Sequence, residues 1–224
     1  MFLQCPAPPE AIRITMKLTS EYFESAGITV RQPARGHRYG QESLALAEFA
    51  RIEPGQRAAE LGAGTALVSL LIAARQRPRE VVAIEIQPEF HEIAQRNVKE
   101  NGYDTVVNCV NEDYREYAKS NSGSFDCVVA NPPFFRAGEG RLSPDPARAA
   151  ARHEINGTIE DLAHAAHRLL KPGGSFFVVF DARRDEELKR AAGAAGFKMI
   201  RTGTPQTAAY FLTEFRKPIK DRGY

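Results

Sequence analysis

Short apolar runs rich in β-branched residues alternate with longer helical patterns from about residue 58 onward. This alternation is typical of β-α-β units and predicts a mostly parallel sheet. The runs are hydrophobic almost throughout, which indicates strands buried on both faces. The strands predicted in this way are 57–61, 81–86, 106–110, 125–130 and 175–180.

The segments between these strands carry helix start and stop signals. A helix over 88–101 begins with Pro88 in its first turn and stops at Gly102. Another begins at Thr158, which forms an approximate capping box with Asp161. The remaining predicted helices are 42–52, 67–75 and 185–195.

Two further strands, 197–203 and 209–215, are separated by only about five residues. A parallel crossover needs a dozen or more, so these strands must form an antiparallel hairpin. A parallel sheet that ends in such a hairpin distinguishes one α/β architecture from the plain dinucleotide-binding fold. The predicted fold is the Rossmann-like, seven-stranded class I methyltransferase fold, in which the cofactor is S-adenosylmethionine (SAM).

The chain shows no internal repeat, low-complexity tract or long linker. We expect one domain with four segments, which are a loosely attached N-terminal extension over 1–15, a cap over 16–57, the methyltransferase domain over 58–216 and a basic tail over 217–224.

The composition restricts the cellular compartment and the partners that we expect, and it does not change the predicted fold. Of the 224 residues, 43% are hydrophobic and 26% charged, and the three cysteines form no C-x-x-C pair, so a disulfide scaffold or cysteine zinc site is not supported. No run reaches the ~20 apolar residues that a membrane helix needs. We therefore expect a cytoplasmic protein with no membrane or metal partner. The net charge of +2 confines any nucleic-acid contact to a local patch.

A glycine-rich turn follows the first buried strand. Gly62 and Gly64 permit a tight turn and close approach of a ligand to the backbone, with Ala63 between them. Glu60 stands just before the turn, where it suits a cationic amino-acid group better than a pyrophosphate. This acid favours SAM over a nicotinamide cofactor.

Acids also follow the next two strands. Glu85, with Ile86 beside it, has the spacing of an acid that binds ribose hydroxyls. Asp113, in preference to Glu112, is predicted to accept the adenine amino group. Acids at strand ends can instead simply cap the following helix, and each position alone leaves that alternative open. Together with the glycine turn, the pair favours a cofactor site.

The segment Asn131-Pro132-Pro133-Phe134 directly follows the strand over 125–130, at the sheet edge where ligands bind. The Asn131 side-chain oxygen and the Pro132 carbonyl, held outward by the di-proline, can accept both hydrogens of a planar amine and favour a pyramidal nitrogen. Phe134 offers a face for stacking. No general base is needed before transfer, so catalysis is by positioning and electrostatics.

The chain resembles class I SAM-dependent methyltransferases of the Asn-Pro-Pro-aromatic group, most closely the bacterial tRNA1(Val) adenine-37-N6 methyltransferases. The resemblance rests on Arg31-Gln32-Pro33 with Gly36 and Tyr39-Gly40, Glu60 to Thr65, Asn131 to Phe135, Arg152-His153-Glu154, and Leu169 to Gly174. It implies that Glu60 and Glu85 bind SAM and that Asn131 orients the target nitrogen while lying beside the cofactor.

The expected activity is therefore SAM-dependent methylation of the exocyclic N6 amine of an adenine in structured RNA, with a tRNA anticodon loop as the first candidate. Protein glutamine-N5 methylation, DNA adenine-N6 methylation and SAM binding without catalysis remain alternatives. Two basic clusters could hold RNA phosphates. They are Arg31, Arg35 and Arg38 in the cap, and Arg136, Arg141 and Arg148 in the long connection after Phe135.

Overall fold

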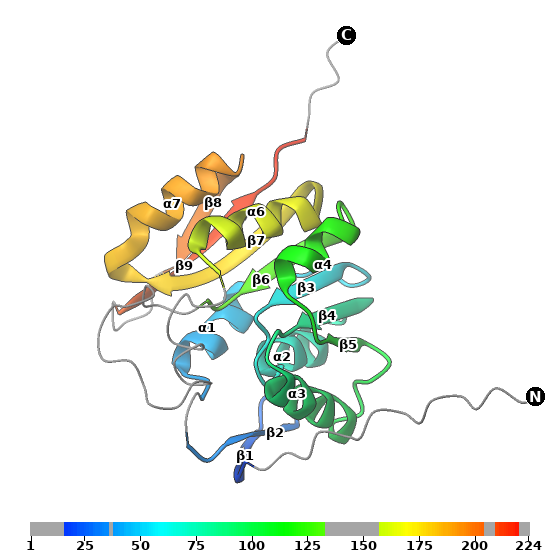
Figure 1. Cartoon of the computed structure of the whole chain (residues 1–224). Coiled ribbons are helices and arrows are strands. Elements are labelled where there is room, and N and C mark those ends of the chain that lie inside the picture. Colours follow the sequence, from blue (N-terminus) through cyan, green and yellow to red (C-terminus); the bar gives the residue numbers. More distant parts are fainter. Residues whose placement is uncertain (1–15, 36–37, 133–156, 204–208, 220–224) are drawn as a thin grey trace, which may run out of the picture.

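The computed structural model describes residues 16–35, 38–132, 157–203 and 209–219. Its main sheet contains β3 (Arg57–Leu61), β4 (Glu80–Ile84), β5 (Val107–Val110), β6 (Phe125–Ala130), β7 (Leu170–Asp181), β8 (Lys198–Gly203) and β9 (Tyr210–Arg216). These seven strands lie in the order β5-β4-β3-β6-β7-β9-β8. The sheet runs through the centre of the molecule (Figure 1).

The predicted fold class is confirmed. Strands β3 to β7 pair in parallel, whereas β9 pairs antiparallel with both β7 and β8. The predicted C-terminal hairpin is thus present, and its second strand is inserted between β7 and β8. Two strand boundaries differ from the prediction by two or more residues. Strand β4 ends at Ile84, so Glu85 and Ile86 lie beyond it, and β7 already begins at Leu170.

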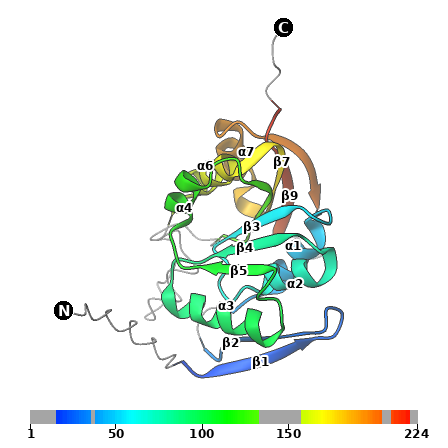
Figure 2. The same ribbon diagram turned by 90° about the vertical axis from the view of Figure 1, so that its right-hand side faces the viewer.

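Six α-helices cover the sheet in the described part of the chain. They are α1 (Gln41–Phe49), α2 (Leu67–Gln76), α3 (Pro88–Glu100), α4 (Tyr114–Ser120), α6 (Ile159–Leu169) and α7 (Asp185–Ala194), with the 3-10 turn η2 (Ala182–Arg184) before α7. Helices α1, α2 and α3 lie on one face, and α4, α6 and α7 on the other (Figure 2). The capping box at the start of α6 is confirmed, since Thr158 Oγ1 accepts a hydrogen bond from the Asp161 amide at 3.1 Å.

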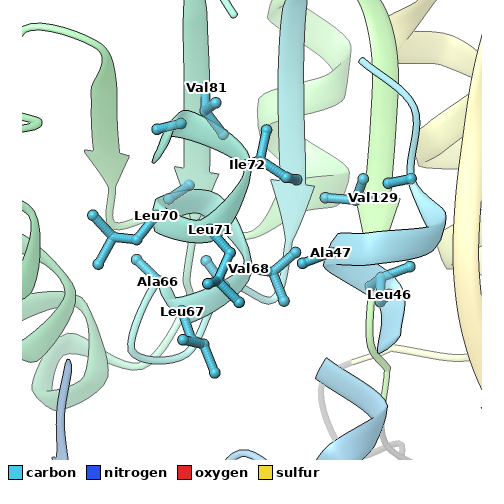
Figure 3. Packing of buried hydrophobic residues seen from close by; sticks show 14 of the residues in the cluster. Leu46, Ala47, Ala66, Leu67, Val68, Leu70, Leu71, Ile72, Val81 and Val129 are labelled. Carbon is cyan, nitrogen blue, oxygen red and sulfur yellow. The ribbon is translucent and has the colours of Figure 1, made fainter. Parts of the chain in front are cut away.

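The core on the α1–α3 face is built around α2. Leu70, Leu71 and Ile72 are fully buried, and Figure 3 shows this helix against Val81 of β4 and Val129 of β6. Burying one such side chain stabilises the fold by about 1.5–3 kcal/mol. This packing fixes the start of α2, and with it the glycine turn, against the ends of the central strands.

The sequence pattern did not reveal a small antiparallel ribbon formed by β1 (Leu18–Phe23) and β2 (Ile28–Pro33). Most of β1 is exposed and polar, so it lacks the apolar alternation that predicts a half-buried strand. The β1–β2 ribbon lies beside helices α2 and α3 (Figures 1 and 2). The cap segment 16–57 therefore contributes strand β2, which lies next to helices α2 and α3.

The first residue of the predicted basic tail is bound to the fold. The Lys217 ammonium group donates to the carbonyls of His167 and Leu170 at the end of α6, at 2.8 and 2.7 Å. A cation at this helix end also complements the helix dipole. None of the described helices combines the length and apolarity needed to cross a membrane.

Candidate active site

The carboxyl ends of four parallel strands meet at one edge of the sheet. Leu61 of β3 lies level with Ile84 of β4 on one side and with Ala130 of β6 on the other, and Ile84 lies level with Val110 of β5. Glu60 lies near the end of β3 itself, and the loops after β4, β5 and β6 hold Glu85, Asp113 and Asn131. The tertiary structure thus brings together segments separated by up to 70 residues in the sequence, at the edge where open α/β sheets bind ligands.

The glycine turn has the backbone conformation that its sequence requires. Gly62 and Gly64 have φ angles of 72° and 55°, a region that favours glycine. The amides of Gly62 and Ala63 both donate to the Ile84 carbonyl at 2.9 Å, which fastens the turn to the end of β4. A Cβ atom built on either glycine would meet no described atom within 4 Å, so the surface beside the turn is open to a ligand.

Glu60 is a buried acid held at the start of α2. Its carboxylate oxygen Oε2 accepts hydrogen bonds from the Ser69 amide at 2.9 Å and the Ser69 hydroxyl at 2.5 Å. Burial raises the pKa of Glu60 to about 8, although the bonds from Ser69 oppose this rise. The uncharged form is therefore favoured near neutral pH until a cation approaches.

Glu85 is also buried and lies in the loop after β4. Its two carboxylate oxygens accept hydrogen bonds from the amides of Gly64 at 2.8 Å and Gln87 at 2.9 Å. Burial raises the pKa of this carboxyl, and the backbone bonds partly counteract the rise. Each oxygen keeps a lone pair for a ligand hydroxyl. The Asn111 amide donates to the carbonyls of Glu85 and Ile86, which fixes this loop, and the Ile86 side chain is partly exposed.

Neither Glu60 nor Glu85 forms an ion pair with a basic side chain in the described part of the chain. Buried carboxylates without a counter-charge are costly in free energy. A ligand carrying a sulfonium and an ammonium group, together with ribose hydroxyls, supplies both the charge and the donors that these acids lack. The residues present fit SAM.

Asp113 caps helix α4, as the simpler alternative allowed. Its side chain accepts from the Arg115 amide at 2.8 Å and pairs with the Arg115 guanidinium at 2.5 Å. Burial would raise the pKa of Asp113, but the bonds and charge of Arg115 outweigh it and lower the pKa. An adenine amino group would have to share oxygens that already have partners, so this assignment stays a prediction.

Asn131 lies at the end of β6 and contacts the cap. Its carboxamide nitrogen donates a hydrogen bond of 2.9 Å to the hydroxyl of Ser43, a buried residue of α1. With the nitrogen occupied in this way, the side-chain oxygen is the group left to accept a hydrogen from a substrate. Pro132 follows and is half-buried. Pro133 and Phe134 lie outside the described residues.

The arginines predicted to hold RNA are distributed over two regions. Arg31 pairs with Glu100 of α3 at 2.7 Å, and Arg38 donates to the Thr19 hydroxyl at 3.1 Å, whereas Arg35 is exposed. A phosphate would therefore compete with Glu100 for Arg31. The second cluster, Arg136, Arg141 and Arg148, lies outside the described residues. The described part also holds no group of three or more His, Cys, Asp or Glu side chains placed to bind a metal ion.

Four polar residues that support this site were not found from the sequence. Ser69 holds Glu60, Asn111 holds the loop of Glu85, Ser43 holds Asn131, and Asn97 links the cap to the glycine turn. Most of these contacts join residues more than 20 positions apart, and no local pattern marks them. Asn97 could have been suspected, because a polar residue on the apolar face of a helix needs a buried partner.

The strand order, the glycine turn and the two buried acids define a class I methyltransferase, the SAM-dependent class. Residues 40–191 match the family described as "Methyltransferase small domain", and the chain belongs to this family.

Comparisons with individual proteins agree with this class. The chain is 29% identical over 180 residues to a Bacteroides fragilis protein named tRNA1(Val) (adenine(37)-N6)-methyltransferase, covering 80% of this chain and 75% of that protein. Among solved structures, it is similar to Pyrococcus horikoshii TYW2 in complex with MeSAdo, with a TM-score of 0.64 and 15% identity, over 89% of this chain and 70% of that one. The [4+2]-cyclase SpnF has a TM-score of 0.61 at 16% identity, covering 80% of each chain. A shared fold thus does not fix the reaction.

Proposed function

We propose that this protein transfers a methyl group from SAM to the exocyclic N6 amine of an adenine in structured RNA, with a tRNA anticodon-loop adenine as the first substrate to test. The observation that carries the proposal is the placement of Asn131 at the sheet edge that also holds Glu60 and Glu85. The names of relatives such as the Bacteroides fragilis protein support the choice of adenine and of tRNA.

The chemistry of the target explains why an asparagine serves here. The lone pair of an adenine amine is delocalised into the ring, so the nitrogen is a weak nucleophile. When bound, SAM would supply an electrophilic methyl group from its sulfonium, with S-adenosylhomocysteine as the thioether left behind and one amine proton released after the methyl has arrived. The Asn131 oxygen and the Pro132 carbonyl accept the two amine hydrogens and favour a pyramidal nitrogen whose lone pair points at the methyl group. These interactions strengthen as the amine gains positive charge, so they stabilise the transition state.

Base access also favours a loop of folded RNA. Loop bases are unpaired and can be splayed out of the stack at low cost in free energy, whereas a duplex base must first be unstacked. A tRNA of fixed shape also offers phosphates in a defined arrangement to basic side chains.

The decisive experiment is a comparison of modified nucleosides in tRNA from a strain that lacks this gene and from its parent, measured by mass spectrometry. We expect one N6-methyladenosine to be lost and to return when the wild-type gene is supplied, but not when Asn131→Ala is supplied. Unchanged tRNA nucleosides would contradict the tRNA substrate.

An assay with the purified protein separates the alternatives. Radiolabelled methyl transfer is measured from SAM to bulk tRNA, to DNA and to protein extract, each with wild type and Asn131→Ala. Transfer to tRNA supports the proposal, and transfer to DNA or protein identifies one of the other amine substrates. SAM binding without transfer to any of the three would indicate a binding module.

A further inference from the structure

Gln32 of β2 is a buried side chain with an unsatisfied acceptor. The residue is 1% exposed, and its side-chain oxygen Oε1 is fully buried and has no hydrogen-bond partner in the described part of the chain. A buried carbonyl oxygen without a donor is costly in free energy, and native structures seldom leave one unless a ligand or water completes it.

The register of the ribbon shows where Gln32 points. Side chains alternate along a strand, so Gln32 lies on the same face of β2 as Ile28 and Val30. Ile28 and Val30 belong to the core cluster that contains Ala66, the N-cap residue of α2, and Leu67, its first residue. Gln32 therefore faces the side of the molecule on which the glycine turn leads into α2.

Two asparagines, one in the last turn of α3 and one directly after the helix, fix the position of β2 along the molecule. Asn101 exchanges two hydrogen bonds of 2.8 Å with the backbone of Thr29, and Asn97, one helical turn earlier, exchanges bonds of 2.8 and 2.9 Å with the backbone of Arg31. Because α3 starts at the cofactor edge of the sheet, β2 approaches that edge as it runs from Thr29 to Arg31. Gln32 is the next residue along this path.

Asn97 also links this part of β2 to the glycine turn itself. The same carboxamide nitrogen that donates to Arg31 donates to the Thr65 carbonyl of the glycine turn at 2.9 Å, and Asn97 is fully buried. The residue before Gln32 is thus one side chain away from the turn. The backbone around Arg31 and Gln32 is therefore held close to the turn that precedes α2.

The two ends of the cofactor make different demands. Glu85 and Asp113, which follow β4 and β5, are predicted to bind the ribose and the adenine, and this prediction directs the amino-acid end toward β3 and its glycine turn. That end carries an α-ammonium group with three hydrogen-bond donors. Such a group suits the Gln32 side-chain oxygen, which accepts no hydrogen bond within the described part of the chain. We infer that Gln32 accepts a hydrogen bond from the α-ammonium group of the bound cofactor.

This inference rests on the proposed use of SAM, and its test uses two ligands that share the nucleoside. S-adenosylhomocysteine carries the α-ammonium group, and 5′-methylthioadenosine lacks the whole amino-acid end. Calorimetry of wild type and Gln32→Met, a variant of similar volume without the oxygen, gives four dissociation constants. We expect Gln32→Met to raise the dissociation constant of S-adenosylhomocysteine by about tenfold or more, since the lost bond is to a charged group. The dissociation constant of methylthioadenosine should change by no more than about twofold.

Two further variants complete the test. Gln32→Glu keeps an acceptor in place and should retain S-adenosylhomocysteine within a few-fold, whereas Glu85→Ala, which acts on the shared ribose, should weaken both ligands. If Gln32→Met does not fold, Gln32→Ala removes the same oxygen and is compared in the same way. Equal weakening of both ligands, or of neither, in the variant without the oxygen would overturn the role of Gln32. A wild-type protein that binds neither ligand would instead overturn the cofactor itself.

Discussion

The carboxamide nitrogen of Asn131 lies 2.9 Å from the hydroxyl of Ser43, a residue 88 positions earlier in the chain. Asn131 directly follows strand β6 of the central sheet and Ser43 belongs to helix α1 of the cap, so this bond joins the proposed catalytic group to a different part of the fold. Because Ser43 is buried, water competes weakly for the bond. The cap thus helps to hold the amide that we propose acts on the substrate.

Removal of the Ser43 hydroxyl should therefore lower the turnover number without changing the affinity for the cofactor. We expect Ser43→Ala to reduce kcat by about 5- to 50-fold, because a freed amide is less well oriented in the transition state. The SAM dissociation constant should stay within about twofold. Steady-state kinetics and calorimetry check both values. In an Asn131→Ala background the same change should have no further effect, and additive losses would argue against action through Asn131.

Asn131→Ala should separate binding from chemistry. The side chain is proposed to contact the target amine and not the cofactor's charged groups, so SAM affinity should change by less than a few-fold while single-turnover methyl transfer falls by about 10²-fold or more. A matched control is Asn121→Ala, which removes an asparagine at the far end of α4 that bonds only the Tyr117 carbonyl among the described residues. Near wild-type transfer by Asn131→Ala would refute the proposed mechanism.

Glu85→Ala should weaken SAM binding by about tenfold or more. Two ribose hydroxyls lose their charged acceptor, and the amides of Gly64 and Gln87 lose the group that fixes the turn against the loop. Glu89→Ala, an exposed acid four residues later in the first turn of α3, is the control and should leave the affinity unchanged. Calorimetry that gives the same constant for wild type and Glu85→Ala would remove Glu85 from the site.

The buried carboxyl of Glu60 should make cofactor binding depend on pH. Burial raises its pKa to about 8 in the free protein, and a bound cation favours the ionised form. Binding between about pH 6 and pH 8 therefore requires loss of a proton, and SAM affinity should rise with pH by up to about tenfold per unit and level off above pH 8. Titrations at several pH values, with Glu60→Gln as the variant that cannot ionise, test this dependence.

The raised pKa of Glu60 also determines how the stability of the free protein changes with pH. The unfolded carboxyl titrates near 4.5 and the folded one near 8, so the contribution of Glu60 is fully present below about pH 4.5 and is lost as pH rises toward 8. Glu60→Gln should flatten the fall in Tm across this window. An equal slope in wild type and variant would assign the effect to other groups.

The salt dependence of RNA binding should identify the basic cluster that holds the substrate. Each phosphate contact contributes about one released counterion to the slope of log K against log salt concentration. Replacement of Arg31, Arg35 and Arg38 by alanine should lower the slope if the cap holds RNA, with SAM affinity unchanged. Replacement of Arg136, Arg141 and Arg148 is the matched variant for the other cluster. Two unchanged slopes would exclude both clusters as the RNA contact.

The sequence by itself determined the fold class, because the relevant signals are local. Apolar runs buried on both faces specify parallel strands, and the short connection before β9 excludes a parallel crossover. The same holds for the glycine turn, where only glycine readily adopts the positive φ angles of Gly62 and Gly64. The position of Glu60, Glu85 and Asn131 at one edge then follows from the rule that parallel strands end together.

Only the tertiary structure decided how these groups are supported. The β1–β2 ribbon pairs an exposed, mostly polar strand with β2, whose Ile28 and Val30 pack in the core and whose backbone is held by Asn97 and Asn101. The periodicity of β1 could therefore not reveal the ribbon. Whether Asp113 caps a helix or meets a ligand depends on Arg115, and the unsatisfied oxygen of Gln32 exists only because distant elements bury it. Such contacts depend on the packing of segments far apart in the chain, and no local propensity encodes them.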